Sequence, residues 1–310
     1  MDTIKNKFSG VIINPGCSLN CVFCGGHSRA PEIQLKKQEI GVYQNLQDFK
    51  ARGVKGLSIS GSDPIEYEKI TELIKYIKDE GFTFIQLATN GTRLADPSFL
   101  ESLISSGLSA IKIPLYGSEK KIHDAVTRTA GSFDDVIEGI KNLIKKAPEI
   151  EIKLTCLVLK QNKDDLFNIV DIATEMGIKN LSFSIPCLTE KDDSFYIPLK
   201  DLSPYFKKLY NYAFKINNRI MFIEIPFCVF DQFNMKNINN RVSPPALGQY
   251  NQPLEVVRTG IPNLPSYRLK KKIPACNDCR AFDYCDGFFV NDINRFGVGE
   301  IKPIKSIKAN

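Results

Sequence analysis

The stretch Cys17-Ser18-Leu19-Asn20-Cys21-Val22-Phe23-Cys24 places three cysteines within eight residues, in the spacing C-x3-C-x2-C. It follows a short apolar run, residues 10–14, that predicts a β-strand. Three thiolates on one loop can bind one metal centre, and thiolates are typical ligands of zinc and of iron–sulfur clusters. Zinc sites usually take a fourth protein ligand, and none is adjacent here, although His27 is near. A 4Fe–4S cluster held by three cysteines leaves one iron open to an outside ligand.

The composition is that of an ordinary globular protein. The chain has 310 residues, of which 43% are hydrophobic and 25% charged, so a disordered or collagen-like chain is excluded. No window approaches the roughly 18 apolar residues of a membrane span, and the run at residues 11–13 is too short for a signal peptide. We therefore expect a cytoplasmic protein without a membrane partner. The net charge of 41 − 35 = +6 is spread along the chain and does not indicate nucleic acid.

The nine cysteines are the informative part of this composition. In a reducing cytoplasm, cysteines are more often metal ligands or catalytic groups than disulfides. We therefore expect several of them to bind metal.

Short apolar runs alternate with amphipathic stretches through the first two thirds of the chain. Six strands are predicted at residues 10–14, 56–60, 83–88, 110–115, 150–157 and 180–185. Five helices are predicted at residues 38–52, 64–80, 97–106, 133–146 and 164–176. The helix stops are expected at Gly53, Gly81, Gly107 and Gly177. This alternation predicts parallel strands in an α/β fold, with a barrel-like or an open sheet.

The regular alternation of apolar runs and amphipathic stretches ends after residue 201. A helix is predicted at residues 202–216 and a strand at 220–225, whereas the Asn- and Pro-rich stretch 234–265 has no periodic element. We expect two domains, 1–215 and 216–310, of which the second is small, irregular and ordered by a metal.

A second group of cysteines lies in this C-terminal part. Cys276, Cys279 and Cys285 form C-x2-C-x5-C, and Cys228 lies upstream of them. Four thiolates saturate either a tetrahedral zinc ion or a 4Fe–4S cluster, and the spacing alone does not choose between them. The basic run at residues 268–272 predicts a solvated face, with a docking strip for a reductant or an acidic peptide as the alternative.

Two cysteines remain outside these groups. Cys156 lies in an apolar strand, which is typical of a cysteine that packs as a small hydrophobe. Cys187 follows the sixth predicted strand, at the end where α/β folds have their active sites. Packing is one interpretation of Cys187, and a catalytic role as hydrogen-atom donor to a substrate radical is the other.

The three-cysteine motif, with the aromatic Phe23 before its last cysteine, resembles the signature of the radical S-adenosylmethionine (SAM) superfamily. The resemblance covers about residues 8–190 and implies a partial (β/α)6 TIM-like barrel. It implies that Cys17, Cys21 and Cys24 bind a 4Fe–4S cluster whose open iron chelates the methionine part of SAM. In that family one electron cleaves the sulfonium to a 5′-deoxyadenosyl radical, which abstracts hydrogen from substrate while the protein excludes water.

Other stretches resemble further parts of this family's pattern. Gly61-Ser62-Asp63-Pro64 resembles its Gly-Gly-Glu-Pro turn, which contacts the methionine amino group, with Ser62 in place of glycine and the shorter Asp63 in place of glutamate. Thr89-Asn90-Gly91 resembles its Thr-Asn-Gly turn beside the cofactor. Residues 115–128 resemble its fourth-strand segment, in which Arg128 would pair with the methionine carboxylate. The resemblance thus implies contacts with SAM at Phe23, Gly61, Ser62, Asp63, Asn90 and Arg128. Simple turn formation and a solvated charge are the plain alternatives.

The C-terminal cysteines resemble those of the extensions called SPASM and twitch domains, in which C-x2-C-x5-C binds an auxiliary 4Fe–4S cluster. The chain has too few cysteines for the full SPASM pattern, so the single-cluster, twitch-like version fits better. Cys228 is then the expected fourth ligand beside Cys276, Cys279 and Cys285, and zinc is the alternative.

These features together predict a radical SAM enzyme that acts on a peptide or peptide-like substrate by crosslinking, oxidation or epimerisation. Conversion of a small molecule in cofactor or natural-product biosynthesis is the enzyme alternative. A non-catalytic iron–sulfur or zinc scaffold is the alternative of another class. The expected partners are the substrate and an electron donor such as flavodoxin or ferredoxin.

Overall fold

The chain divides into two compact units in a computed structural model that describes residues 7–24, 31–188, 194–216, 220–230, 255–256 and 270–304. Unit 1 contains the described residues 7–24, 31–115, 119–154 and 255–256. Unit 2 contains the described residues 116–118, 155–188, 194–216, 220–230 and 270–304. The predicted boundary near residue 215 stays a prediction, because these units are defined by compactness and not by independent folding. His27 and most of the stretch 234–265 lie outside the described residues.

Unit 1 is built on parallel strands. They are β1 (Lys7–Ile13), β2 (Val54–Gly61), β3 (Phe84–Ala88), β4 (Ala110–Pro114) and the short β8 (Glu255–Val256). Their order is β8-β1-β2-β3-β4, and each neighbouring pair is parallel. Strand β5 (Glu151–Leu157) contains the boundary between the units. Because parallel strands need a crossover connection, each is followed by a helix on the way to the next.

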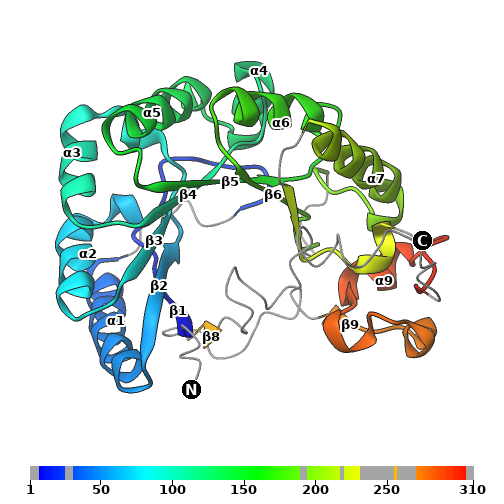
Figure 1. Cartoon of the computed structure of the whole chain (residues 1–310), viewed down its shortest axis with the longest axis horizontal. Coiled ribbons are helices and arrows are strands. Elements are labelled where there is room, and N and C mark those ends of the chain that lie inside the picture. Colours follow the sequence, from blue (N-terminus) through cyan, green and yellow to red (C-terminus); the bar gives the residue numbers. More distant parts are fainter. Residues whose placement is uncertain are drawn as a thin grey trace. The chain divides into compact units, whose positions relative to one another are not determined.

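The helices of unit 1 cover one face of these strands. They are α1 (Glu32–Ala51), α2 (Ile70–Asp79), α3 (Pro97–Ser105), α4 (Lys120–Thr127) and α5 (Ser132–Lys146). Figure 1 shows α1, α2, α3 and α5 on the same side of β2 and β3. Helix α2 buries an apolar stripe with the i, i+3, i+4, i+7 spacing, made by Ile70, Leu73, Ile74 and Ile77. The strands bury alternate residues against these helices, among them Leu57, Ile59, Ile85, Leu87, Ile111 and Ile113.

Unit 2 combines parallel strands with a small irregular part. Strands β6 (Asn180–Ser184) and β7 (Ile220–Ile223) are parallel, and the helices are α6 (Leu166–Glu175), α7 (Leu199–Lys215) and α9 (Val290–Phe296). Strand β9 (Lys270–Lys271) pairs antiparallel with β10 (Phe288–Phe289). Three phenylalanine rings pack around Phe222, with the ring centroids of Phe230, Phe206 and Phe183 at 4.6, 5.4 and 6.1 Å from its own.

The predicted α/β class is confirmed, and the parallel strands with their covering helices are consistent with the partial (β/α)6 barrel. All four glycines expected as helix stops have positive φ, between +73° and +99°. The predicted helix 64–80 is wrong at its start, because a 3-10 turn (Pro64–Glu66) precedes α2. The short helices α4 and α9 were not predicted, since seven or eight residues give too little periodicity to detect.

In the parts of the chain that the structure describes, every helix is too short or too polar to cross a membrane.

We predict that Gly61→Ala destabilises the protein more than Gly53→Ala does. Both glycines have positive φ, so both substitutions strain the backbone. A Cβ at Gly61 would lie 1.7 Å from the backbone oxygen of Ile13, whereas a Cβ at Gly53 would meet nothing within 4 Å. The clash should cost about 1–3 kcal/mol beyond the shared strain. Urea unfolding of the two variants measures this difference, and equal unfolding free energies would contradict it.

Candidate functional site

The three-cysteine loop leaves the end of β1 in unit 1 and is fastened to the end of α4. The backbone N–H of Asn20 donates to the Thr127 oxygen at 3.1 Å, and that of Val22 donates to the Val126 oxygen at 2.9 Å. These carbonyls belong to the last turn of α4, where they have no partner within the helix. The N–H of Cys24 closes a turn onto the Cys21 oxygen at 3.1 Å. The loop is therefore shaped by backbone bonds rather than by the thiols.

The three thiols are close enough for their charges to interact. Burial and the neighbouring thiols Cys24 and Cys17 raise the pKa of Cys21 to about 12. Burial is also the main cause that raises the pKa of Cys17, with smaller contributions from Asp63 and Cys24. Thiols with raised pKa values lose their protons at neutral pH only when a cation compensates the negative charge of the thiolates. This donor set therefore fits a metal centre bound by three thiolates.

The end of β2 supports the cysteine loop through Ser62. The Ser62 hydroxyl accepts from the backbone N–H of Gly16 at 3.0 Å, directly before the first cysteine. The Ser62 N–H in turn donates to Oδ1 of Asn14 at 2.9 Å. Serine in place of the family's glycine thus has a structural reason here, since a glycine would leave the Gly16 N–H without this acceptor.

Asp63 is a fully buried carboxyl at the start of the following turn. Its Oδ1 accepts from the Thr89 hydroxyl at 2.7 Å, whereas its Oδ2 has no hydrogen-bond partner among the described residues. Burial raises the pKa of Asp63 to about 7, although the bond from Thr89 opposes the rise. A buried carboxylate oxygen without a partner is costly, so a cationic ligand at this position would relieve that cost.

Asn90 connects the end of β3 to the cysteine loop. Its side-chain amide donates to the Ser18 hydroxyl at 3.1 Å and lies 3.5 Å from the Cys17 sulfur, while its Oδ1 accepts from the Thr92 N–H at 2.9 Å. The neighbouring Gly91 has φ +86°, and a Cβ there would lie 2.8 Å from the side chain of Ile113. Asn90 thus connects the end of β3 to the cysteine loop, as Ser62 connects the end of β2 to the residue before its first cysteine.

In residues 115–128, which follow β4, Asp124 has a structural role and Arg128 is exposed. Asp124 accepts from the N–H groups of Gly131 and Phe133, at 2.8 and 2.9 Å, and from the hydroxyl of Ser132 at 2.9 Å, so it shapes the start of α5. Arg128 ends α4 with φ 51°, exposed and without a hydrogen bond or ion pair to the described residues. Its position directly after the carbonyls that hold the cysteine loop is compatible with the predicted contact with a carboxylate.

Phe23 lies half-buried in the turn between Cys21 and Cys24. Gly61 brings the end of β2 so close to β1 that no side chain fits between them. The contacts of Phe23, Gly61, Ser62, Asp63, Asn90 and Arg128 with SAM stay predictions.

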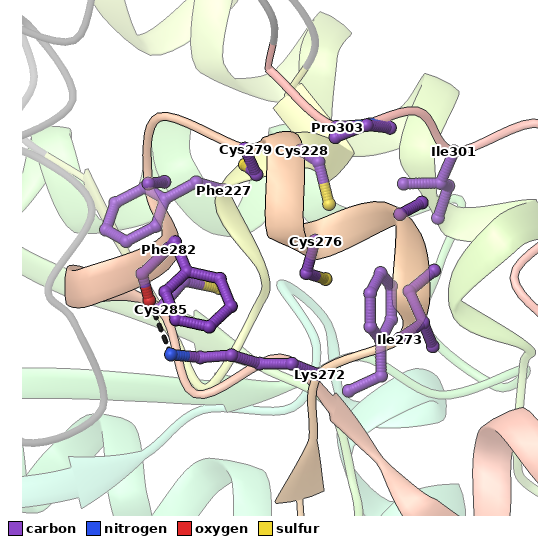
Figure 2. A pocket seen from close by; sticks show the side chains of 13 residues that line it. Phe227, Cys228, Lys272, Ile273, Cys276, Cys279, Phe282, Cys285, Ile301 and Pro303 are labelled. Atoms are coloured by element: carbon purple, nitrogen blue, oxygen red, sulfur yellow. Dashed lines mark hydrogen bonds between the residues drawn. The ribbon is translucent and has the colours of Figure 1, made fainter.

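In unit 2 the second group of cysteines lines one pocket, shown in Figure 2. Cys228, Cys276, Cys279 and Cys285 share it with apolar neighbours that include Phe227, Phe282, Ile273, Ile301 and Pro303. Burial raises the pKa of the Cys228 thiol, and the charges of the three other cysteines raise it further. Four thiols in one apolar pocket are the ligand set that a 4Fe–4S cluster takes from a protein. Among the residues that the structure describes, no three metal-binding side chains are close enough to hold a single ion.

Successive turns present these cysteines. The Cys276 N–H donates to the Ile273 oxygen at 2.8 Å, and the Cys279 N–H donates to the Cys276 oxygen at 2.9 Å. Cys228 comes from a 3-10 turn (Phe227–Phe230) whose phenylalanines are both buried. The Gly287 N–H lies 3.4 Å from the Cys285 sulfur and donates to it. Cys228 thus reaches the three later cysteines across a long separation in sequence.

The two remaining cysteines differ in their surroundings. Cys156 is fully buried in β5, which raises the pKa of its thiol and agrees with its predicted packing role. Cys187 lies three residues beyond β6, is half-buried, and interacts electrostatically with Tyr196 and Lys270. Its role as hydrogen-atom donor stays a prediction.

Sequence reasoning missed several residues that hold the site together. Asn14 and the Ser62 hydroxyl link two strand ends, and Thr89 holds Asp63. Short polar residues at the ends of parallel strands were the available signal, because these ends meet at one edge of the sheet.

A parallel α/β sheet with three thiols in the loop after its first strand is the arrangement of a barrel-type protein whose thiols can serve as ligands. The family model "Radical SAM superfamily" matches residues 11–173, just over half of the chain. The chain belongs to the radical SAM superfamily.

Its curated relatives are enzymes of this superfamily. The chain is 29% identical over 167 residues to an AdoMet-dependent heme synthase of Methanosarcina barkeri, covering 53% of this chain and 46% of that protein. It is 28% identical over 228 residues to a probable GTP 3′,8-cyclase of Methanocaldococcus jannaschii, covering 70% of this chain and 72% of that protein. For several of the curated relatives it matches, the chain spans about half of their length.

Solved structures share the fold at low identity. SuiB of Streptococcus suis bound to S-adenosylmethionine has a TM-score of 0.66 and 15% identity, covering 98% of this chain and 77% of that one. The enzyme anSMEcpe with bound AdoMet and a Kp18Cys peptide has a TM-score of 0.54 and 18% identity, covering 69% of this chain and 63% of that one. These similarities show the fold.

We predict that the imidazole of His123 stays neutral down to about pH 4. The ring is buried beside Phe133, with centroids 5.8 Å apart, and burial lowers its pKa to about 4 although Asp124 opposes this. In the unfolded chain its pKa is near 6.5, so its contribution to stability is present above about pH 6.5 and is lost as the pH falls toward 4.

The chain has two histidines, so histidine-labelled protein gives two NMR titration curves, and the His123→Gln variant identifies the one to read. A midpoint near 6.5 for the curve that this variant removes would contradict the prediction.

Proposed function

We propose that the protein is a radical SAM enzyme that reductively cleaves SAM and abstracts hydrogen from a peptide or peptide-like substrate. The observation that carries this proposal is the juxtaposition of three thiols on one loop with the buried, half-satisfied carboxylate of Asp63. A thiolate-bound iron centre and the ammonium group of SAM are the partners that these two features lack.

The residues of the candidate site each have a separate role in this proposal. Cys17, Cys21 and Cys24 bind a 4Fe–4S cluster, and when bound it supplies the electron that turns SAM into a 5′-deoxyadenosyl radical. Asp63 accepts the methionine ammonium through its unpartnered Oδ2. Arg128, exposed beside the loop, pairs with the methionine carboxylate.

The proposal includes an auxiliary 4Fe–4S cluster of the twitch type in unit 2. The support is the apolar pocket lined by Cys228, Cys276, Cys279 and Cys285. Four ligands from the chain would close this site to substrate, which favours a role in electron transfer or in ordering the unit.

A peptide substrate is favoured by two structural relatives. SuiB has been solved bound to its precursor peptide SuiA, with a TM-score of 0.63 over 98% of this chain. The anSMEcpe structure also contains a peptide. Crosslinking, oxidation and epimerisation remain the candidate reactions, and Cys187 is the proposed hydrogen-atom donor if the reaction is an epimerisation.

A small-molecule substrate is the second candidate. The curated relatives with 28–29% identity are a GTP 3′,8-cyclase and a heme synthase, which resemble this chain more closely in sequence than the peptide-bound structures do. Product analysis by mass spectrometry, with short peptides and with nucleoside triphosphates as substrates, distinguishes the two candidates.

We predict that the anaerobically reconstituted and reduced protein forms 5′-deoxyadenosine from SAM, and that replacing Cys17, Cys21 and Cys24 together by Ala abolishes this. The triple variant should lose about four irons, one 4Fe–4S cluster, and keep those of the auxiliary site. Cys156→Ala is the control, because this buried cysteine lines neither site. Full activity of the triple variant would refute the proposal, and an inactive wild type would favour a scaffold.

We predict that Asp63→Asn weakens SAM binding by about 10- to 100-fold, since a bond between charged groups is worth about 1.5–3 kcal/mol. Asparagine keeps the bond from Thr89 but removes the negative charge. Glu66→Gln is the matched control, because this neighbouring carboxylate acts on Asp63 only through its charge. Equilibrium dialysis without reductant measures binding, and equal dissociation constants for the two variants would contradict the role of Asp63.

A further inference from the structure

The lysines of the basic run do not all belong to a solvated face. Lys270 and Lys271 form β9, and Lys272 follows directly. Because successive side chains of a strand point to opposite sides, Lys270 and Lys272 project to one side and Lys271 to the other. The surroundings of Lys270 and Lys272 can therefore be compared with those of Lys271 on the opposite side.

Lys270 carries a half-buried ammonium group. Its Nζ donates to the backbone oxygen of Glu224 at 3.2 Å and lies 4.6 Å from the ring centroid of Phe289, its partner across the hairpin. Glu224 has the unusual φ of 64°, a conformation rare outside glycine, and its carbonyl accepts from this lysine. The charge of Lys270 also interacts with the carboxylates of Glu224 and Asp286 and, more weakly, with the thiols of Cys187 and Cys285.

Lys272 lies along the pocket of the auxiliary cysteines. Figure 2 shows its side chain at one edge of that pocket, with its ammonium bonded to the backbone oxygen of Phe282 at 2.6 Å. The ammonium also lies 3.7 Å from the centroid of the Phe282 ring. Two contacts with one residue hold a flexible lysine in place, although its side chain is more exposed than that of Lys270.

Lys271 has neither a half-buried ammonium group nor a place along the pocket of the auxiliary cysteines. It is exposed, and its Nζ reaches only the side-chain oxygen of Asn294 among the hydrogen bonds of the described residues, at 3.4 Å. Its backbone oxygen instead faces Gly287, where a Cβ would come within 2.2 Å.

Four thiolate ligands give an iron–sulfur cluster a net negative charge, and reduction adds one more. The potential of such a cluster depends on nearby charge, hydrogen bonds to its sulfurs and solvent exposure. A fixed positive charge in a partly desolvated site stabilises the reduced form more than the oxidised form.

We propose that the positive charges of Lys270 and Lys272 raise the reduction potential of the cluster bound at the auxiliary cysteine site. This inference rests on the proposed function, because it requires that the site bind a 4Fe–4S cluster. Lys271 has no such effect, because its exposed side chain projects to the other side of the strand.

The test uses the full chain in which Cys17, Cys21 and Cys24 are replaced by Ala, so that the auxiliary cluster alone gives a signal. In this background we compare Lys270→Met, Lys272→Met and Lys271→Met by redox titration monitored by electron paramagnetic resonance. Methionine keeps the length of the side chain and removes its charge. Lys270→Arg restores the charge, and Lys270→Gln is a second neutral variant.

The expected result is a lower midpoint potential for Lys270→Met and for Lys272→Met, with Lys271→Met and Lys270→Arg close to the parent. Equal potentials for the 270 and 271 methionine variants would overturn the proposal. Loss of the cluster from both neutral variants at 270 would also overturn it, by assigning Lys270 to holding the site together. Absence of iron from the parent itself would instead refute the auxiliary cluster of the proposed function.

Discussion

The candidate active site depends on the attachment of the cysteine loop to the last turn of α4. A helix leaves its final carbonyls without partners, and a loop leaves its N–H groups without partners. In unit 1 each satisfies the other, through Asn20 to Thr127 and Val22 to Val126. The three thiols therefore approach one another because the backbone between them is fixed, while burial and the neighbouring thiols raise the pKa of Cys21 and so oppose its ionisation. The remaining contacts of Ser62 and Asn90 with this loop build on that attachment.

Ser62 and Asp63, the two residues that depart from the family's Gly-Gly-Glu-Pro turn, have different consequences for the site. Ser62 adds a bond that a glycine could not make, and it ties the end of β2 to Gly16. Asp63 replaces a longer acid and is held by Thr89 in a fully buried position. Two residues before Asp63, the close approach of β2 to β1 at Gly61 leaves no room for a side chain.

Much of this architecture could be predicted from the sequence, because apolar periodicity and glycine stops are local signals. The strands, the order of helices and the three-cysteine motif follow from such signals. The role of α4 could not be predicted, since an eight-residue helix has a weak pattern and its carbonyl partners lie a hundred residues earlier. The environments of Lys270 and Lys272 were missed for a similar reason. A run of basic residues indicates a solvated face, whereas in the structure Lys270 is half-buried beside Phe289 and Lys272 lines the pocket of the auxiliary cysteines.

Asp124 shows how far the influence of a residue outside both cysteine groups can extend. Its carboxylate accepts three hydrogen bonds and thereby fixes the corner between α4 and α5, next to the carbonyls that hold the cysteine loop. Loss of that corner would loosen the loop without altering any ligand. In a genetic screen, an allele that changes Asp124 would therefore be grouped with alleles that change the cysteines, and its phenotype alone would not reveal that the lesion lies in the scaffold.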